Sequence, residues 1–383
     1  MSSTPNNKQD ILSGTAIFEH RQNRLSSLLQ DSGLAAIILN PGPTLTYLTG
    51  LQFHLMERPV VAIFSSAQPV RLVIPELEAA KTSHLSYPVQ VFQYGEDPST
   101  WPTVFREAIL AAELAGQIGV EPTRLRFLEL RLVEAAAPEA HFQSAENVLV
   151  DLRIRKDVSE LALLRRAVEI AQYALENTLP MIRIGLTERQ IALELTQQLF
   201  KAGADPEMPF SPIVAAGPNS ANPHSAPSDR FLEEGDLLVI DWGAYFGGYC
   251  SDLTRTFALG KVDPEISKIA DIVKEANQAG RAAAKPGETA EVVDQAARKV
   301  IDQAGYGAYF THRTGHGIGM EGHEAPYMRA GNSMILEPGM VFTVEPGIYL
   351  PNRNGVRIED DVVITDKASE TLSTLPRQLI SIG

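Results

Sequence analysis

The sequence of 383 residues contains a single cysteine, Cys250, so no disulfide can form within one chain. Long hydrophobic runs are also missing: the longest, Leu34–Leu39 and Val60–Phe64, fall far short of the roughly 20 apolar residues of a membrane-spanning helix. The first twelve residues have neither the basic start nor the apolar core of a signal peptide. We therefore expect a cytoplasmic protein without a membrane segment.

Positive charge is scarce as well. Lysine and arginine number 33 against 47 aspartate and glutamate residues, which gives a net charge of -14. Nucleic-acid affinity depends largely on basic side chains that neutralise phosphates, so we expect no nucleic-acid partner. Hydrophobic residues make up 44% and charged residues 21%, as in a globular protein, and the length suits two domains.

The sequence pattern changes near residue 152. From about 17 to 150, short strand-like runs such as VVAIF alternate with helix-like segments, which predicts an α/β domain. The charged stretch DLRIRKD then precedes a helix in which Asp157 and Glu160 have capping-box spacing. We expect a polar tail at 1–14, one domain at 15–152 and a second domain at 153–383.

The second domain contains an internal duplication. A threonine, a helix and a glycine follow one another from Thr187 to Gly203 and again from Thr289 to Gly305; each threonine is a natural N-cap and each glycine a natural C′ residue. Further on, LEEGDLLVIDWGAYF from residue 232 aligns without gaps on LEPGMVFTVEPGIYL from residue 336. Two copies predict two α/β halves related by a pseudo-twofold axis.

Carboxylates recur at strand ends in both copies. Asp241 ends one apolar strand and Asp252 begins the next. If Phe246-Gly247 is the turn between them, Asp241 lies directly opposite Asp252, with Cβ atoms about 5 Å apart. In the second copy Glu345 and Glu359 are roughly opposite across a longer hairpin. The pseudo-twofold axis would bring the two carboxylate pairs together.

Such a cluster of carboxylates requires positive charge, because each ionised group raises the pKa of the others. Arg255 and Arg357 are possible partners, and His316 in TGHGIG adds an imidazole within a glycine-rich segment. Four carboxylates with one imidazole suit two divalent ions, with Mn²⁺ as first choice and Co²⁺ or Zn²⁺ as alternatives. A hydroxide would bridge ions about 3.5 to 4 Å apart as the nucleophile.

Four motifs carry a family resemblance: IDWGAYFGGYCSDLTRTF, HRTGHGIGMEGHE, TVEPGIY and GVRIED. They resemble the metal-site series of the pita-bread peptidases, which include methionine aminopeptidase, Xaa-Pro aminopeptidase and prolidase. The resemblance covers about 157–383, and NPGPTLTYLTGL at 40–51 resembles the creatinase/prolidase N-terminal domain. Methionine aminopeptidases lack that domain, so the resemblance implies the proline-specific branch and an α/β (α+β) protein with a pseudo-twofold catalytic domain.

The resemblance also implies the site residues. The metal ligands would be Asp241, Asp252, His316, Glu345 and Glu359. Of these, Asp252 and Glu359 would bridge the two ions, and Glu345 would be the general base.

Four further residues match catalytic positions of the family. His323 would stabilise the tetrahedral intermediate and His224 would close over the substrate, while Tyr349 and Arg357 match the tyrosine and arginine of the proline-specific members. We place Thr254 and His312 beside the ligands, with His312 supporting His316.

The implied function is cleavage of the Xaa-Pro bond in short peptides with proline at the second position. Tyr327 stands where many prolidases have an arginine that holds the carboxylate of a dipeptide. We therefore put an Xaa-Pro aminopeptidase first and a prolidase as the alternative, in which Arg329, Arg357 or a residue of the N-terminal domain would bind the carboxylate. Remoter alternatives are a creatinase-like hydrolase without metal and a non-catalytic binding module.

The segment after YLTGL adds a last expectation. Family members are commonly homodimers in which this loop reaches the active site of the partner, so the resemblance implies a homodimer. Phe53 would face the proline ring, and His54 and Arg58 would bind a peptide carboxylate.

Overall fold

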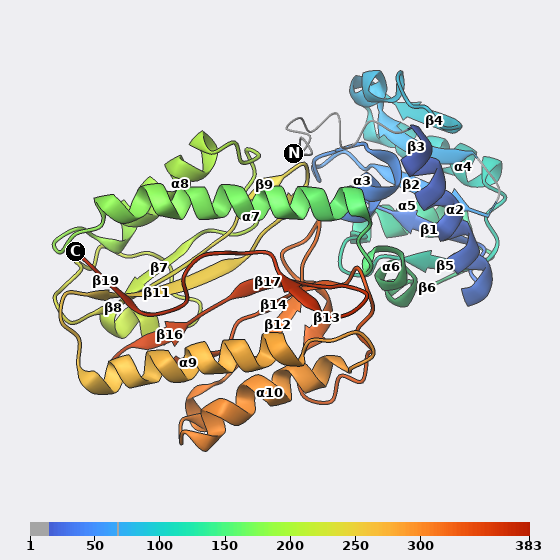
Figure 1. Ribbon diagram of the computed structural model, residues 1–383. Helices are drawn as coiled ribbons and strands as arrows, with labels where there is room; N and C mark the ends of the chain where they lie inside the picture. The colour runs from blue at the N-terminus through green and yellow to red at the C-terminus, as the bar shows by residue number, and fades with distance from the viewer. Residues whose placement is uncertain (1–14, 67–68) are drawn as a thin grey trace, which may run out of the picture. The chain divides into compact units, whose positions relative to one another are not determined.

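In a computed structural model, which describes residues 15–66 and 69–383, the chain forms two compact units (Figure 1). The first unit ends at Arg153 and the second begins at Ile154. The polar tail expected at 1–14 lies outside the described residues. No helix in the described ranges is long and apolar enough to cross a membrane.

The N-terminal unit is an α/β layer structure built on one mixed sheet, in the order β4-β3-β2-β1-β5-β6. Its apolar core includes Ile38 on β1, Ile63 on β2 and Phe105 on α4. The strands are β1 (Ala36–Leu39), β2 (Val61–Ser65), β3 (Val70–Pro75), β4 (Val89–Tyr94), β5 (Gly116–Val120) and β6 (Ala140–Ser144). The helices are α2 (Thr15–Ser32), α3 (Pro43–Thr49), α4 (Trp101–Ala111), α5 (Phe127–Ala136) and α6 (Glu146–Arg153), with the 3-10 helices η1 (Glu76–Thr82) and η2 (Pro98–Thr100).

The C-terminal unit places its strands between two helix pairs (Figure 1). The helices are α7 (Val158–Thr178), α8 (Glu188–Lys201), α9 (Pro264–Ala283) and α10 (Ala290–Gln303); α7 packs against α8, and α9 against α10. The 3-10 helices are η3 (Leu179–Met181), η4 (Gly217–Ala221) and η5 (Gly307–Tyr309).

Two sheets and two short hairpins make up the strands of this unit. One sheet has the order β19-β11-β8-β7, with β7 (Ile213–Ala216), β8 (Leu237–Trp242), β11 (Leu253–Leu259) and β19 (Ile380–Ile382). The other has the order β13-β12-β14-β17-β18, with β12 (Gly315–Gly317), β13 (Glu324–Met328), β14 (Val341–Val344), β17 (Asp360–Ile364) and β18 (Ser369–Thr371). The hairpins are β9 (Tyr245–Phe246) with β10 (Tyr249–Cys250), and β15 (Gly347–Tyr349) with β16 (Gly355–Arg357).

The duplication is visible at the helix ends of this unit. Gly203 and Gly305 have φ values of 98° and 84° and close their helices with the same pair of backbone hydrogen bonds, which form a Schellman motif. Thr187 and Thr289 both occupy N-cap positions, but only Thr187 accepts a bond from the N3 backbone, that of Gln190. The expected glycine caps and the N-cap positions of both threonines are confirmed, although the side chain of Thr289 makes no capping bond within the described residues.

This difference gives a test of stability within one molecule. Thr187→Ala should lower the free energy of unfolding by about 1 kcal/mol, because it removes the side-chain acceptor of the Gln190 N–H and leaves only the turn bond to the Thr187 carbonyl oxygen. Thr289→Ala is the matched control and should cost less, because the Thr289 side chain makes no capping bond. Urea denaturation of both variants measures the difference. Equal losses would mean that the cap of Thr187 contributes nothing.

The turn between the carboxylates of the first copy differs from our expectation. Tyr249 pairs with Phe246, so the turn residues are Gly247 and Gly248, with φ values of 61° and 80°. A two-residue hairpin turn with positive φ at both positions favours glycine at both, which excludes the Phe246-Gly247 turn. As a result Asp241 lies opposite Thr254 on β11, and Asp252 is its diagonal neighbour on the same face. The directly opposite pairing was wrong by two residues.

The second carboxylate pair agrees with the expected pairing. Val344 pairs with Asp360 on one side and Gly347 with Arg357 on the other, in one continuous register. This register puts Glu345 opposite Glu359.

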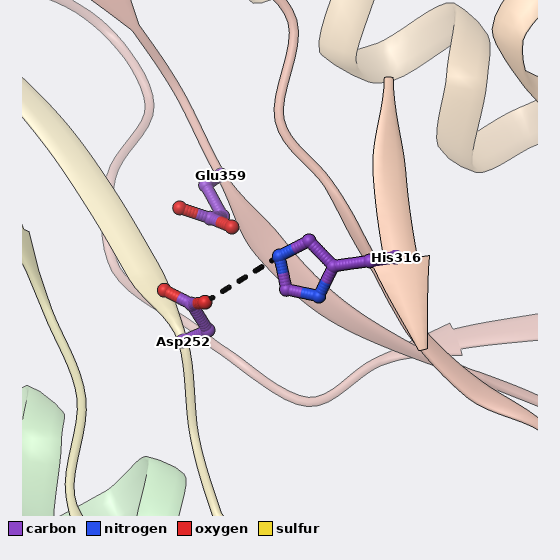
Figure 2. Close-up of side chains that lie close together, drawn as sticks. All are labelled: Asp252, His316 and Glu359. Atoms are coloured by element: carbon purple, nitrogen blue, oxygen red, sulfur yellow. Dashed lines mark ion pairs between the residues drawn. The ribbon is translucent and has the colours of Figure 1, made fainter. Parts of the chain in front are cut away.

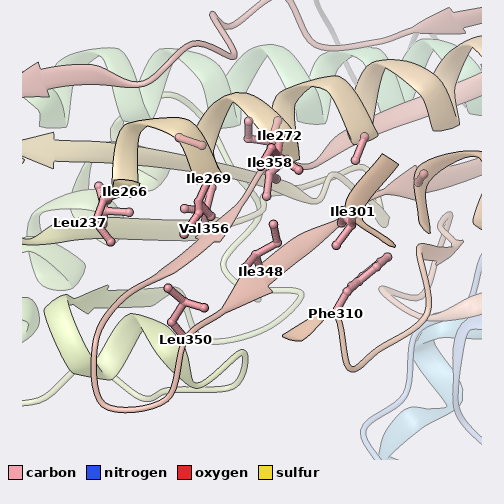
Figure 3. Close-up of a cluster of buried hydrophobic side chains, with 14 of the residues drawn as sticks. Leu237, Ile266, Ile269, Ile272, Ile301, Phe310, Ile348, Leu350, Val356 and Ile358 are labelled. Atoms are coloured by element: carbon pink, nitrogen blue, oxygen red, sulfur yellow. The ribbon is translucent and has the colours of Figure 1, made fainter. Parts of the chain in front are cut away.

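An apolar cluster holds this hairpin in place (Figure 3). Ile348 on β15 and Val356 on β16 pack with Ile269 and Ile272 of α9, and all four side chains are buried. Burial of these side chains against α9 fixes the strand ends that carry the carboxylates.

Candidate metal centre

Acidic and imidazole side chains from both halves meet at strand ends. Figure 2 shows that Asp252, just before β11, His316 on β12 and Glu359, just before β17, point toward one another. Each of the three offers one ligand atom, these atoms lie within 4.8 Å of one another, and the three residues are buried. Asp241 at the end of β8 and Glu345 after β14 complete the expected ligand set.

The ring of His316 is held in the state that a metal ligand needs. Its Nδ1 lies 3.1 Å from the carbonyl oxygen of Gly317, which can only accept, so Nδ1 carries the proton. Nε2 therefore presents its lone pair, 3.4 Å from Glu345 Oε1 and 3.7 Å from Asp252 Oδ2. Burial, and then the charge of His323, lowers the pKa of His316 well below its usual value, which keeps the ring neutral.

The carboxylates have free oxygen atoms and raised pKa values. Asp241 Oδ1 and Glu359 Oε1 are buried and have no hydrogen-bond partner in the part of the chain that the structure describes. Burial, and then the charge of neighbouring carboxylates, holds the pKa of Asp252 and Glu359 well above the usual range. Burial raises the pKa of Glu345 to about 7, although Arg357 acts in the opposite direction. A divalent cation would offset this repulsion and use the free oxygens, so these residues fit a metal centre.

Arg357 connects several of these groups. Its Nη2 donates to Asp241 Oδ2 at 2.5 Å and its Nη1 to the Tyr349 hydroxyl at 3.0 Å. Its Nε donates to Thr254 Oγ1 at 3.1 Å, and Thr254 Oγ1 in turn donates to Glu359 Oε2 at 2.6 Å. Arg357 thus neutralises one carboxylate of the cluster and leaves the others for a cation.

Two neighbouring aspartates were not singled out from the sequence. Asp361 is buried and accepts the backbone N–H of Asp252 at 3.0 Å, so it positions that ligand. Asp360 pairs with Arg255 at 2.8 Å and Arg377 at 2.7 Å, and these cations lower its pKa although burial alone would raise it. Arg255 is therefore a partner of Asp360 and not of the metal-site carboxylates. The run of acidic residues in RIEDD is the sequence feature that could have indicated both aspartates.

His312 supports a different residue from the one we expected. Its Nδ1 donates to the carbonyl oxygen of Arg313 at 2.8 Å, so Nε2 accepts the hydroxyl proton of Tyr349 at 2.8 Å. Burial lowers the pKa of His312 to about 4, which is consistent with a neutral acceptor. The expectation that His312 supports His316 is corrected: its hydrogen bonds orient Tyr349.

His323 lies against the metal-site histidine from the exposed side. Its ring centroid is 3.9 Å from that of His316, and Arg313 Nη2 lies 3.4 Å from its Nδ1. The guanidinium carbon of Arg313 is 4.5 Å from the centre of the Tyr327 ring. The sequence analysis did not identify Arg313 as a residue of the site. Its position between His312 and the glycine-rich TGHGIG motif could have indicated it.

His224 stands on the loop after η4. Its side chain is exposed, and its backbone N–H donates to Asn222 Oδ1 at 3.1 Å. Its charge contributes to the lowered pKa of His323, after burial and the charge of Arg313. This position at the open side of the site is compatible with the expected contact to substrate.

The loop expected to reach a partner's site belongs to the N-terminal unit. Arg58 is paired with Glu57 at 2.6 Å and Glu96 at 2.8 Å, while Phe53 has Lys81 Nζ 5.0 Å from its ring centre. The side chain of His54 is exposed. Arg58 thus has two carboxylate partners within its own unit, and its expected role at a substrate carboxylate stays a prediction.

Comparison with known proteins identifies both parts of the chain. The profile of metallopeptidase family M24 matches residues 162–366, and that of the creatinase/prolidase N-terminal domain matches residues 21–155. An Xaa-Pro dipeptidase of Lactobacillus delbrueckii subsp. lactis is 36% identical over 361 residues, which cover 93% of this chain and 97% of that protein.

Solved structures agree over nearly the whole length. A dipeptidase from Pyrococcus horikoshii OT3 has a TM-score of 0.89 and 36% identity, and the alignment covers 94% of this chain and 100% of that one. An X-Pro aminopeptidase from Thermotoga maritima MSB8 has a TM-score of 0.83 and 31% identity, with 94% and 99% covered. The expected fold class, a creatinase/prolidase-like domain followed by a pita-bread domain, is confirmed. The chain therefore belongs to metallopeptidase family M24.

Proposed function

We propose that this chain is an Xaa-Pro dipeptidase, a hydrolase that cleaves the bond before proline in dipeptides. The observation that carries this proposal is the near full-length similarity to the Lactobacillus Xaa-Pro dipeptidase, together with the fit of Asp252, His316 and Glu359 to a metal. The X-Pro aminopeptidase structure is less similar than the Pyrococcus dipeptidase structure, at 31% against 36% identity. The comparisons thus support our alternative better than the aminopeptidase that we put first.

We propose that the site holds two divalent ions, with Mn²⁺ as first choice. Asp252, His316 and Glu359 would hold one ion, and Asp241 and Glu345 would complete the pair of sites. Asp252 and Glu359 would be shared, in keeping with the family resemblance. When bound, such ions polarise the scissile carbonyl and make a bound water acidic enough to act at neutral pH.

The protein's own side chains would bind and orient the substrate and move protons. Glu345, whose Oε1 accepts a bond from Thr343 at 3.3 Å, would take the proton of the attacking water. His323 would donate from Nε2 to the oxygen that becomes negative, because Arg313 occupies Nδ1. Tyr349, fixed between Arg357 and His312, would face the same oxygen or the proline.

We also propose a homodimer located in the cytoplasm. The dimer follows from the family resemblance, and the location from the single cysteine and the absence of a membrane-spanning helix among the described residues.

A direct test compares Ala-Pro with Ala-Pro-Ala. Ala-Pro should have a kcat/KM at least about 10-fold higher, because only the dipeptide presents its carboxylate next to proline and a hydrogen-bonded charge is worth that factor. Chelation followed by dialysis should abolish turnover, and Mn²⁺ should restore it. A preference for the tripeptide would return the assignment to an aminopeptidase. Undiminished turnover after chelation would favour the creatinase-like hydrolase.

A further inference from the structure

A dipeptidase needs a positive group for the free carboxylate of its substrate, and the obvious arginines are already engaged. Arg357 is buried and bonded to Asp241, Tyr349 and Thr254. Arg58 has two carboxylate partners. Arg329 is exposed and donates to the carbonyl oxygen of the next residue.

Arg313 is different from these three. Within residues 15–66 and 69–383, no carboxylate oxygen lies within 4.0 Å of its guanidinium nitrogens, although the neighbouring metal centre is rich in acids. Among the described residues, its guanidinium contacts the ring of Tyr327 and Nδ1 of His323, and the side chain is half-buried. Arg313 acts on the carboxylates of the site only at longer range, where its charge opposes the raised pKa of Glu345, so its N–H groups are not used in an ion pair with a described residue.

The two contacts leave the guanidinium free to bind an anion. The Tyr327 ring takes up the face of the planar group, an interaction that does not use the N–H donors. His323 accepts from one of the five N–H groups, so a pair of adjacent N–H groups can still hold both oxygens of a carboxylate.

Arg313 is connected to the candidate metal centre through a single side chain. Its Nη2 contacts His323, and the ring of His323 lies tilted against that of His316. A carboxylate at Arg313 is thus one imidazole away from the metal-site histidine, on the open side of the site. Arg313 also lies over Tyr327, the position at which a carboxylate-binding arginine was expected.

We infer that Arg313 binds the free α-carboxylate of the proline in an Xaa-Pro dipeptide, with Tyr327 holding the guanidinium by its ring face. This inference rests on the proposed dipeptidase function. The positive charge comes from the segment before β12, whereas Tyr327 on β13 supplies the stacking surface. A peptide extended beyond proline, or a C-terminal amide, lacks the charge that Arg313 recognises.

The experiment compares Ala-Pro with its amide, Ala-Pro-NH₂, in wild type, Arg313→Gln and the matched control Arg166→Gln, which changes an arginine of α7 that is paired with Glu169 and lies over the ring of Phe246. Arg313→Gln should raise the KM for Ala-Pro at least about 10-fold and leave that for the amide within about 2-fold. Arg166→Gln should change neither. If kcat falls equally for Ala-Pro and for its amide, that fall reflects the lost contact with His323. It leaves the ratio of the two KM values unchanged. Equal changes in KM for acid and amide, or no change in either, would overturn the inference.

Binding without catalysis gives a second readout. Titration calorimetry should show that L-proline binds wild type more tightly than L-prolinamide, and that Arg313→Gln removes this preference. Tyr327→Phe keeps the stacking ring and should keep the preference, while Tyr327→Leu should weaken it. If wild type hydrolyses neither Ala-Pro nor its amide, the dipeptidase assignment fails. The proline titration still decides about Arg313: an unchanged preference in Arg313→Gln would exclude it as the carboxylate ligand.

Discussion

Asp252→Asn is expected to abolish metal binding at one site and to lower kcat/KM for Ala-Pro by about 10³-fold or more, because the loss of a metal ion removes several kcal/mol of transition-state stabilisation. The asparagine keeps the size of the side chain but removes the negative charge. Asp252 Oδ2 lies 3.7 Å from His316 Nε2, and the backbone N–H of residue 252 is held by Asp361, so the fold around the substitution should persist.

The control for this variant is Asp271→Asn. Asp271 is an exposed carboxylate of the same unit, paired only weakly with Lys274 at the surface. It should retain full activity and full metal content. Metal content is measured by elemental analysis after dialysis, together with the denaturation midpoint. An Asp252→Asn protein that binds the same amount of metal as wild type and remains active would show that Asp252 is not a ligand.

The sequence predicts those parts of the site that depend on the two-residue period of strands and on the residue preferences of turns and caps. Glu345 and Glu359 lie opposite one another because Gly347 and Arg357 continue the same antiparallel register beside them. The Schellman closures at Gly203 and Gly305 follow from the positive φ that only glycine adopts readily.

In the first hairpin, an error of one residue in the position of the turn shifts the predicted strand pairing by two residues. Placing the turn at Phe246-Gly247 instead of Gly247-Gly248 moved the partner of Asp241 from Thr254 to Asp252. Both residues lie on one face because the shift was two residues, so the carboxylates still converge. The chemical conclusion survived an error in geometry because the side-chain period of a strand is two.

Side-chain contacts between residues that are distant in the chain could not be predicted from the sequence. His312 and Tyr349 are distant in the chain, and their hydrogen bond of 2.8 Å depends on how η5 and β15 are packed. The same applies to Arg313, which reaches the face of Tyr327 on β13 from the segment before β12. Our preference for an aminopeptidase rested on the residue type at one position, whereas a charge can enter the same space from a neighbouring segment. If the proposed dipeptidase function holds, the residue type at Tyr327 alone does not determine substrate length.

The hydrogen bonding of His323 leads to the second prediction of a large loss of activity. Arginine can only donate, so the contact from Arg313 Nη2 at 3.4 Å makes Nδ1 of His323 the acceptor and leaves the proton on Nε2. Its ring is tilted against that of His316, with the ring centroids 3.9 Å apart, which places His323 beside the candidate metal centre. A neutral donor placed in this way is suited to the oxygen that gains charge in peptide hydrolysis.

His323→Ala should therefore lower kcat for Ala-Pro by about 10²-fold or more, which is the usual cost of removing one oxyanion donor, with little change in KM. His323→Gln should keep part of the activity, because its amide can still donate. His141→Ala, an exposed histidine of the N-terminal unit, is the control and should be fully active. Steady-state kinetics and elemental analysis separate the two explanations of a loss: if His323→Ala loses its metal along with its activity, His323 is a ligand, and the oxyanion role is wrong.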